Sequence, residues 1–321
     1  MIDLDVKHMA RALELGRGGD PSPNPHVGCV IAQDDAVVGE GYHATAGAEH
    51  AEIVALKAAG KKARGATLYA TLEPCNHVGK TPPCVDAIVA AGIKRVVIGR
   101  RDPNPRVTGG GLERLEQEGV EVKLDVLDAE CKELIRPWAH FVTAGRSYLS
   151  LKLAMSLDGR IALPSGESRW ITGEDARAHV HRQRAGCDMI LVGRGTLEAD
   201  APRLDVRLPG LEDRSPRRAL LTRRDAPEGW TRLGAPEEVF ALGDVNDLLV
   251  EGGAGAASAF LAADLVDRML IYRAPILVGE GKSALGYIGL TALADAHGRW
   301  ELSHGEMLGR DRLEVYERVR S

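Results

Sequence analysis

Two stretches decide the fold of the first half of the chain, HAEIVALKAAG at residues 50–60 and LEPCNHVGKTPPC at residues 72–84. The first has the length and composition of a helix, which Gly60 is expected to end. The second follows a strand-like run at 66–72 and leads through two prolines into another expected helix at 84–92. Strands and helices in alternation predict a three-layer α/β domain.

The same alternation extends away from these stretches in both directions. In the first half we expect a helix at 4–16, strands at 27–31, 37–41 and 95–99, and a helix, a strand and a second helix within 106–138. In the second half we expect strands at 148–156, 188–193, 218–222 and 247–253, and helices at 173–186 and 254–264. A junction at Ala144–Arg146 is expected to divide the chain into domains 1–145 and 146–321.

Length and composition narrow the class of protein. At 321 residues the chain is long enough for two domains. Its net charge of −5 argues against a nucleic-acid-binding protein, which usually carries a basic face. No apolar run approaches the ~20 residues of a membrane helix, and the acidic N-terminus lacks the basic start of a secretion signal. We therefore expect a cytoplasmic protein with neither nucleic-acid nor membrane partners, whose five cysteines form no disulfide scaffold.

A histidine and two cysteines at the ends of these elements predict a metal site. His50 opens one expected helix, Cys75 follows a strand, and Cys84 opens the next helix. A catalytic zinc site takes three such ligands and keeps its fourth position for water, so we expect one zinc ion per chain. Glu52 stands two residues from the histidine, where a carboxylate can shuttle protons. This combination is the pattern of zinc-dependent base deaminases.

The insert between the two cysteine ligands is longer than the two-residue spacing of the short form of this pattern. Eight residues, NHVGKTPP, separate Cys75 from Cys84. His77 and Lys80 in this insert suit a substrate that carries a phosphate, although a loop with unrelated charges explains them equally well. The remaining cysteines have no partner motif and are expected to be buried apolar residues: Cys29, Cys131 and Cys187.

Several motifs, in order along nearly the whole chain, closely resemble the bifunctional deaminase/reductase family of riboflavin biosynthesis. In the first half these are PNPHVGCVI, HAEIVALKAAG, LEPCNHVGKTPPC and DPNP at 102–105. In the second half they are LKLAMSLDGRIA at 151–162, SGESRWITG at 165–173, VGRGTLEADAPRLDVR at 192–207 and VEGGAGAASAFL at 250–261.

The resemblance implies a fold and two consecutive reactions. The first half would be a cytidine-deaminase-like three-layer domain, and the second a dihydrofolate-reductase-like α/β domain. Zinc-dependent hydrolysis would replace an amine on a diaminopyrimidinone bearing a phosphoribosylamino group. NADPH would then reduce the ribosyl group to ribityl. The substrate is thus a small phosphorylated pyrimidine, and we expect a homo-oligomer, either a dimer or a tetramer.

The resemblance also assigns roles to individual residues. In the first half, His50, Cys75 and Cys84 match the zinc ligands and Glu52 the proton donor. Positions associated with the deaminase substrate are Asn24, His43, His77, Lys80, Asp102 and Asn104. Cofactor positions in the second half are Ala154, Trp170, Thr196, Asp200, Gly252, Gly253 and Gly255. Substrate positions there are Ser168, Arg184, Leu204, Arg207 and Glu251.

Lys152 is added to the reductase substrate site for a physical reason. It lies on an expected buried strand, where an unpaired lysine is costly. The loop that contains Gly252 follows a strand and opens a helix, so its backbone N–H groups can approach a pyrophosphate. The sequence does not decide which residue is the general acid of the reduction: Lys152, Asp200 or Glu251.

Some positions depart from the family pattern and leave an alternative open. Ala201 stands where the family usually has an aspartate, and Asp205 where it often has a threonine. The stretch between Arg207 and Leu248 is shorter than usual. The alternative is therefore a single-activity zinc deaminase whose second half has lost reductase activity. A nucleic-acid deaminase fits less well, because its two cysteines are usually closer together, and a structural zinc protein would need a fourth protein ligand.

Overall fold

The computed structural model describes residues 3–76, 82–105 and 110–320. The chain divides into two compact units, residues 1–145 and 146–321, each with its own sheet and its own buried cores. Within the described residues, no helix combines the length and the apolar character that crossing a bilayer requires.

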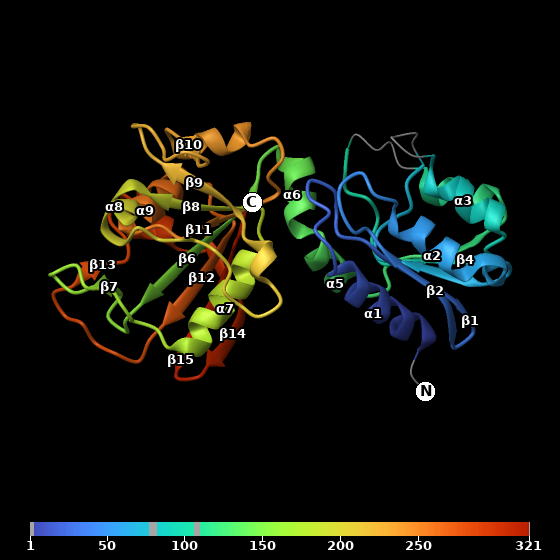
Figure 1. Cartoon of the computed structure of the whole chain (residues 1–321), viewed down its shortest axis with the longest axis horizontal. Helices are drawn as coiled ribbons and strands as arrows, with labels where there is room; N and C mark the ends of the chain where they lie inside the picture. Colours follow the sequence, from blue (N-terminus) through green and yellow to red (C-terminus); the bar gives the residue numbers. More distant parts are fainter. Residues whose placement is uncertain (1–2, 77–81, 106–109, 321) are drawn as a thin grey trace. The chain divides into compact units, whose positions relative to one another are not determined.

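The first unit is built on a five-stranded sheet in the order β2-β1-β3-β4-β5 (Figure 1). Strand β1 pairs with β2 and β3 in antiparallel fashion, whereas β3, β4 and β5 run parallel. The parallel strands bring their carboxyl ends to one edge of the sheet, which is where ligand sites form in open α/β sheets. The strands are β1 (Gly28–Gln33), β2 (Ala36–Tyr42), β3 (Thr67–Ala70), β4 (Arg95–Ile98) and β5 (Glu121–Lys123).

Helices cover both faces of this sheet. On one face α2 and α3 pack through Ala55 and Ile88 against Ile31 of β1. On the other face α1 packs through Met9 against Val97 of β4. The three-layer α/β prediction is therefore confirmed. The helices are α1 (Leu4–Gly16), α2 (Ala51–Ala59), α3 (Cys84–Ala91), α4 (Gly111–Gln117), α5 (Asp128–Leu134) and α6 (Arg136–Ala144).

One detail of the first unit differs from the prediction. The second helix expected within 106–138 is two helices, α5 and α6, which are separated at Ile135. Pro137 lies in the first turn of α6. Because proline has no backbone N–H, it is tolerated in a first turn but not in a helix interior.

A buried carboxylate ties α1 to the sheet. Asp5 accepts two hydrogen bonds from Arg95, at 2.7 and 2.8 Å, one from Lys123 at 2.7 Å and one from the hydroxyl of Tyr69 at 3.2 Å. The hydrogen bonds from Arg95 hold the pKa of Asp5 well below its usual value, against the effect of burial and with help from Lys123. The stabilisation by this charge is therefore present above about pH 4 and is lost as the pH falls further.

We expect Asp5→Asn to lower the free energy of unfolding by about 2–3 kcal/mol at pH 7, since it leaves two cations facing a neutral amide. Urea denaturation followed by circular dichroism measures the change. Asp35→Asn removes a carboxylate from an exposed pair with Lys7, so this control should change the unfolding free energy by less than about 0.5 kcal/mol. Equal effects of the two substitutions would contradict the role of Asp5.

The second unit is built on an eight-stranded sheet in the order β10-β9-β8-β11-β6-β12-β15-β14 (Figure 1). In this order, all neighbouring strands between β10 and β12 pair in parallel fashion. Strand β15 pairs in antiparallel fashion with β12 on one side and with β14, its hairpin partner, on the other. The strands are β6 (Tyr148–Met155), β8 (Met189–Gly193), β9 (Arg217–Leu221), β10 (Thr231–Leu233), β11 (Asp247–Val250), β12 (Arg268–Arg273), β14 (Trp300–Leu308) and β15 (Asp311–Arg318), with a separate pair β7 (Arg160–Ala162) and β13 (Lys282–Ser283).

Two cores lie on opposite faces of this sheet. Phe260 of α9 (Ala254–Ala262) belongs to one, and Val180 of α7 (Glu174–Ala185) to the other. A short helix, α8 (Arg194–Asp200), follows β8. The sequence did not predict α8, β10, β12 or the β14–β15 hairpin. The strand expected at 247–253 ends at Val250, because residues 251–253 form the loop that leads into α9.

Candidate active sites

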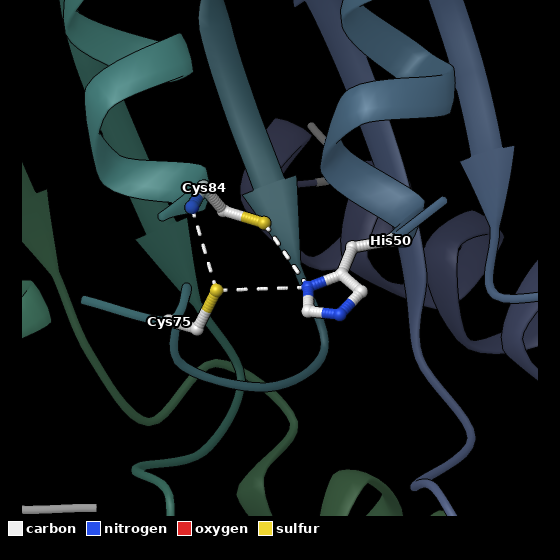
Figure 2. A group of neighbouring side chains, drawn as sticks. All are labelled: His50, Cys75 and Cys84. Carbon is white, nitrogen blue, oxygen red and sulfur yellow. Dashed lines mark hydrogen bonds between the residues drawn. The ribbon is translucent and has the colours of Figure 1, made fainter. Parts of the chain in front are cut away.

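The first candidate site is a cluster of one imidazole and two thiols (Figure 2). His50 lies just before α2, Cys75 follows β3, and Cys84 is the first residue of α3. The Nδ1 atom of His50 is 3.3 Å from Sγ of Cys84 and 3.6 Å from Sγ of Cys75. All three donor atoms lie within 4.8 Å of one another, and soft donors at this spacing fit a zinc ion with an open fourth position.

Without a metal, the environment of the two thiols favours a thiolate at Cys75 and a protonated thiol at Cys84. A hydrogen bond from Cys84 and interactions with His50 lower the pKa of Cys75, against the effect of burial. The backbone N–H of Cys84, at the start of α3, also donates to Sγ of Cys75 at 3.4 Å. The hydrogen bond to Cys75, together with burial, raises the pKa of Cys84. A bound divalent cation deprotonates coordinating thiols, which removes this competition and suits the site to a metal.

Glu52 lies beside the three donors in the first turn of α2 and is almost fully buried. Burial is the largest influence on its carboxyl group and raises its pKa to about 7. A carboxyl group with a pKa near neutrality exchanges its proton readily in both directions, which is what a general acid and base must do.

Asn24 and His43 form a hydrogen-bonded pair next to the cluster. The two ring nitrogens of His43 meet the backbone oxygen of Glu49, at 3.0 Å from Nδ1, and the amide nitrogen of Asn24, at 2.9 Å from Nε2. A carbonyl oxygen only accepts, so Nδ1 carries the proton and Nε2 accepts from Asn24. Both ring nitrogens of His43 are thus used within the protein.

Asp102 and Asn104 lie on the segment that follows β4, at the carboxyl edge of the sheet. Oδ1 of Asp102 accepts a hydrogen bond of 2.8 Å from the backbone N–H of Asn104. His77 and Lys80, which were predicted to contact the substrate, lie outside the described residues.

The second candidate site is a cavity of about 810 Å³ in the second unit. It collects residues from β6, α7, α8 and the loop before α9, which are far apart in the sequence. Of the residues predicted for the reductase site, those lining it are Lys152, Ala154, Ser168, Trp170, Arg184, Thr196, Asp200, Arg207, Glu251, Gly252 and Gly253.

Glu251 is the centre of a charged network in this cavity. It is nearly fully buried and accepts hydrogen bonds of 2.6 and 2.9 Å from the Nε and Nη2 atoms of Arg184. Nζ of Lys152 lies 3.5 Å from Oε2 of Glu251. Burial works to raise the pKa of Glu251, but the attraction of Lys152 and Arg184 outweighs it and leaves the pKa below its usual value. A lowered pKa favours the ionised carboxylate, which the two cations beside it stabilise.

The loop before α9 has the features of a phosphate-binding turn. A Cβ atom on Gly252 would lie only 2.5 Å from Cβ of Ala256, so no larger residue fits there. The backbone N–H of Gly253 donates to Oγ1 of Thr196 at 2.9 Å, which ties the loop to α8. No side chain caps α9. Its first-turn N–H groups can therefore take an anion such as a dinucleotide pyrophosphate, and the loop fits NADPH.

Both halves of the chain match known families. Residues 3–100 match the cytidine and deoxycytidylate deaminase zinc-binding region, and residues 147–312 match the RibD C-terminal domain. The riboflavin biosynthesis protein RibD of Escherichia coli is 41% identical over 343 residues, which cover 91% of this chain and 94% of that protein. The chain belongs to the RibD family. RibD of Mycobacterium tuberculosis is 42% identical over 311 residues, covering 92% of this chain and 91% of that protein.

Solved structures of RibD proteins agree with this assignment. A diaminohydroxyphosphoribosylaminopyrimidine deaminase/5-amino-6-(5-phosphoribosylamino)uracil reductase from Thermotoga maritima matches with a TM-score of 0.90 and 34% identity, covering 98% of this chain and 99% of that chain. Acinetobacter baumannii RibD matches with a TM-score of 0.87 and 35% identity, covering 99% of each chain. The resemblance and the two fold classes that the sequence indicated are confirmed, and the bifunctional reading is supported over a single-activity deaminase.

Two residues predicted for the reductase site do not line its cavity. Leu204 is buried and lines a separate pocket of about 570 Å³. Gly255 is the second residue of α9 and is not among the residues that line the cavity. Conversely, Arg177 and His181 line the cavity and were not predicted. With Arg184 they recur at intervals of four and three residues, which places them on one face of a helix and is the signal that reveals them.

Proposed function

We propose that the first unit hydrolyses an amine from the phosphoribosylamino-diaminopyrimidinone and that the second unit then reduces the product with NADPH. The observation that carries the proposal is the set of His50, Cys75 and Cys84 with the buried Glu52 beside it. This set matches a metal-assisted hydrolysis in which one side chain moves protons. The charged cavity of the second unit supports the second reaction.

In the deaminase, His50, Cys75 and Cys84 would hold one zinc ion, which when bound makes a water molecule acidic enough to ionise near neutral pH. Glu52 would take a proton from that water. As the water oxygen bonds to the ring carbon and the carbon–nitrogen bond breaks, Glu52 would deliver the proton to the leaving amine, which departs as ammonia. Asn24, Asp102 and Asn104, with His77 and Lys80, would bind the substrate, and His43 would orient Asn24.

We expect Cys75→Ala and Cys84→Ala to reduce the zinc content from about one ion per chain to nearly none, because two protein ligands hold zinc poorly. Metal analysis of the purified variants measures this. Cys187→Ala, which removes a thiol from the second unit, should retain full zinc. Full zinc in Cys75→Ala would contradict the ligand assignment.

In the reductase, the loop of Gly252, Gly253 and Gly255 would hold the cofactor pyrophosphate, with Ala154, Trp170, Thr196 and Asp200 lining the rest of the cofactor site. NADPH supplies the hydride. Arg184, Arg207 and Ser168 would hold the substrate, with Arg207 facing its phosphate. Because Glu251 is ionised, Lys152 is better placed than Glu251 to provide the proton that accompanies the hydride.

We propose residues 1–145 as the deaminase domain and 146–321 as the reductase domain. The boundary between the two compact units lies between Gly145 and Arg146 in the sequence. Each unit has its own sheet and core, so each should fold by itself. Limited proteolysis should therefore cut first near Gly145 and release two stable fragments. Initial cleavage inside either unit, with none near Gly145, would count against this boundary.

We also propose a cytoplasmic homo-oligomer, a dimer or a tetramer. Edge strand β14 supports association, because most of its residues are exposed and an open strand edge favours pairing with another chain. Light scattering of the purified protein determines the mass, and a monomer at micromolar concentration would contradict the proposal.

A further inference from the structure

The segment that contains Cys75 also makes hydrogen bonds to the loop that follows β4. The backbone N–H of Glu73 donates to the backbone oxygen of Arg100 at 2.9 Å. The carboxylate of Glu73 accepts in return from the backbone N–H of Asp102, on Oε2, and from that of Leu112, on Oε1, each at 3.3 Å. One side chain therefore holds the backbone both at Asp102, after β4, and at Leu112, in the first turn of α4.

Further contacts hold the same two segments together. Nδ2 of Asn76 donates to the backbone oxygen of Gly110 at 3.0 Å. A Cβ atom on Gly111 would lie 2.4 Å from the backbone oxygen of Pro74, so the two backbones approach each other as closely as glycine allows. Between Glu73 and Asn76 the chain provides Cys75, so the metal ligand and the contacts to the loop belong to one short stretch.

The carboxylate of Glu73 contacts the backbone of the loop that carries Asp102 and Asn104. It binds the N–H of Asp102, whose own carboxylate binds the N–H of Asn104 at 2.8 Å. Through these two hydrogen bonds, Glu73 constrains the positions of Asp102 and Asn104, which are proposed to bind the deaminase substrate. Glu73 is only half-buried and is absent from the cluster of metal donors.

We propose that Glu73 is a positioning residue of the deaminase, which holds Asp102 and Asn104 in register with the metal site. The inference rests on the proposed deaminase function. It predicts that Glu73 affects substrate binding more than the chemical step, because its carboxylate contacts the backbone at Asp102 and Leu112 and is not one of the metal donors.

The test is Glu73→Gln in the full-length, zinc-loaded enzyme. Two backbone N–H groups converge on this carboxylate, and glutamine offers only one acceptor, so one N–H would face an amide NH₂. We expect KM for the deaminase substrate to rise roughly tenfold, the effect of one lost hydrogen bond to a charged group, while kcat changes less than about threefold. Zinc content should stay unchanged. Glu118→Gln, at the residue that follows α4, removes an exposed pair with Arg114. It is the matched control and should leave KM unchanged.

Two further variants separate positioning from a general loss of structure. Glu73→Asp keeps the charge but is one carbon shorter, and it should raise KM in the same way even if Glu73→Gln is insoluble. In the double variant with Asp102→Ala, the rise in KM should be smaller than the product of the two single effects, because Glu73 acts in part through the Asp102 side chain. An unchanged KM, a loss confined to kcat, loss of zinc, or fully additive effects would each overturn the proposal. Wild-type protein that releases no ammonia would instead overturn the proposed function.

Discussion

Replacing Glu52 by glutamine should abolish deamination while leaving the metal in place. Glutamine has the same size and fits the buried position, but it cannot take up and release the proton, and loss of this role typically costs at least ~10²-fold in rate. Ammonia release under saturating substrate measures the loss, and metal analysis should find zinc at the wild-type level.

Two controls make this result specific. Glu49→Gln alters an exposed carboxylate near the same site that pairs with Lys57, and it should keep nearly full deaminase activity. The reductase of Glu52→Gln should work normally on substrate that has already been deaminated. Ammonia release within a few fold of wild type in Glu52→Gln would contradict the proposed role of Glu52.

The second large effect is expected from Glu251→Gln in the reductase cavity. This change leaves Arg184 and Lys152 without their buried counter-charge, and breaking one side of a buried ion pair typically costs 3–5 kcal/mol. Because these residues line the cavity in which the reactants bind, the loss should destabilise the transition state of the reduction. NADPH oxidation should therefore slow by roughly 10²-fold or more. NADPH oxidation after deamination measures the effect.

The position of Glu251 makes this prediction specific to one reaction. Deamination should proceed at the wild-type rate, because the zinc cluster contains no residue of the second unit. Glu280→Gln, an exposed carboxylate elsewhere in the same unit, should leave NADPH oxidation unchanged. Reduction by Glu251→Gln at a rate close to that of wild type would show that the network is not required.

Much of the fold follows from local sequence signals. Helix α2 and its ending at Gly60 follow from an apolar pattern and a glycine, and the division of α5 from α6 is explained by Pro137. Strand β12 was not predicted, because it forms by pairing with β6, which is distant in the sequence. Helix α8 was not predicted because it is short and none of its residues is fully buried, so it has no extended apolar pattern.

Some residues of the candidate sites could be predicted from local sequence patterns, and others could not. The metal cluster was predictable because ligand chemistry restricts it to a few residue types at helix and strand ends. The pairing of Arg184 with Glu251 was not, since these residues lie 67 positions apart. The role of Glu73 was also hidden, because its contacts are backbone N–H groups that carry no sequence signature.

Product analysis by mass spectrometry tests the central claim most directly. The purified, zinc-loaded protein would be given the phosphoribosylamino-diaminopyrimidinone with and without NADPH. We predict that without NADPH the amine is replaced by oxygen and the reaction stops, and that with NADPH the product also gains a hydride and a proton. Absence of any deaminated product would contradict the account, and deaminated product that stays unreduced with NADPH present would show that only the first activity exists.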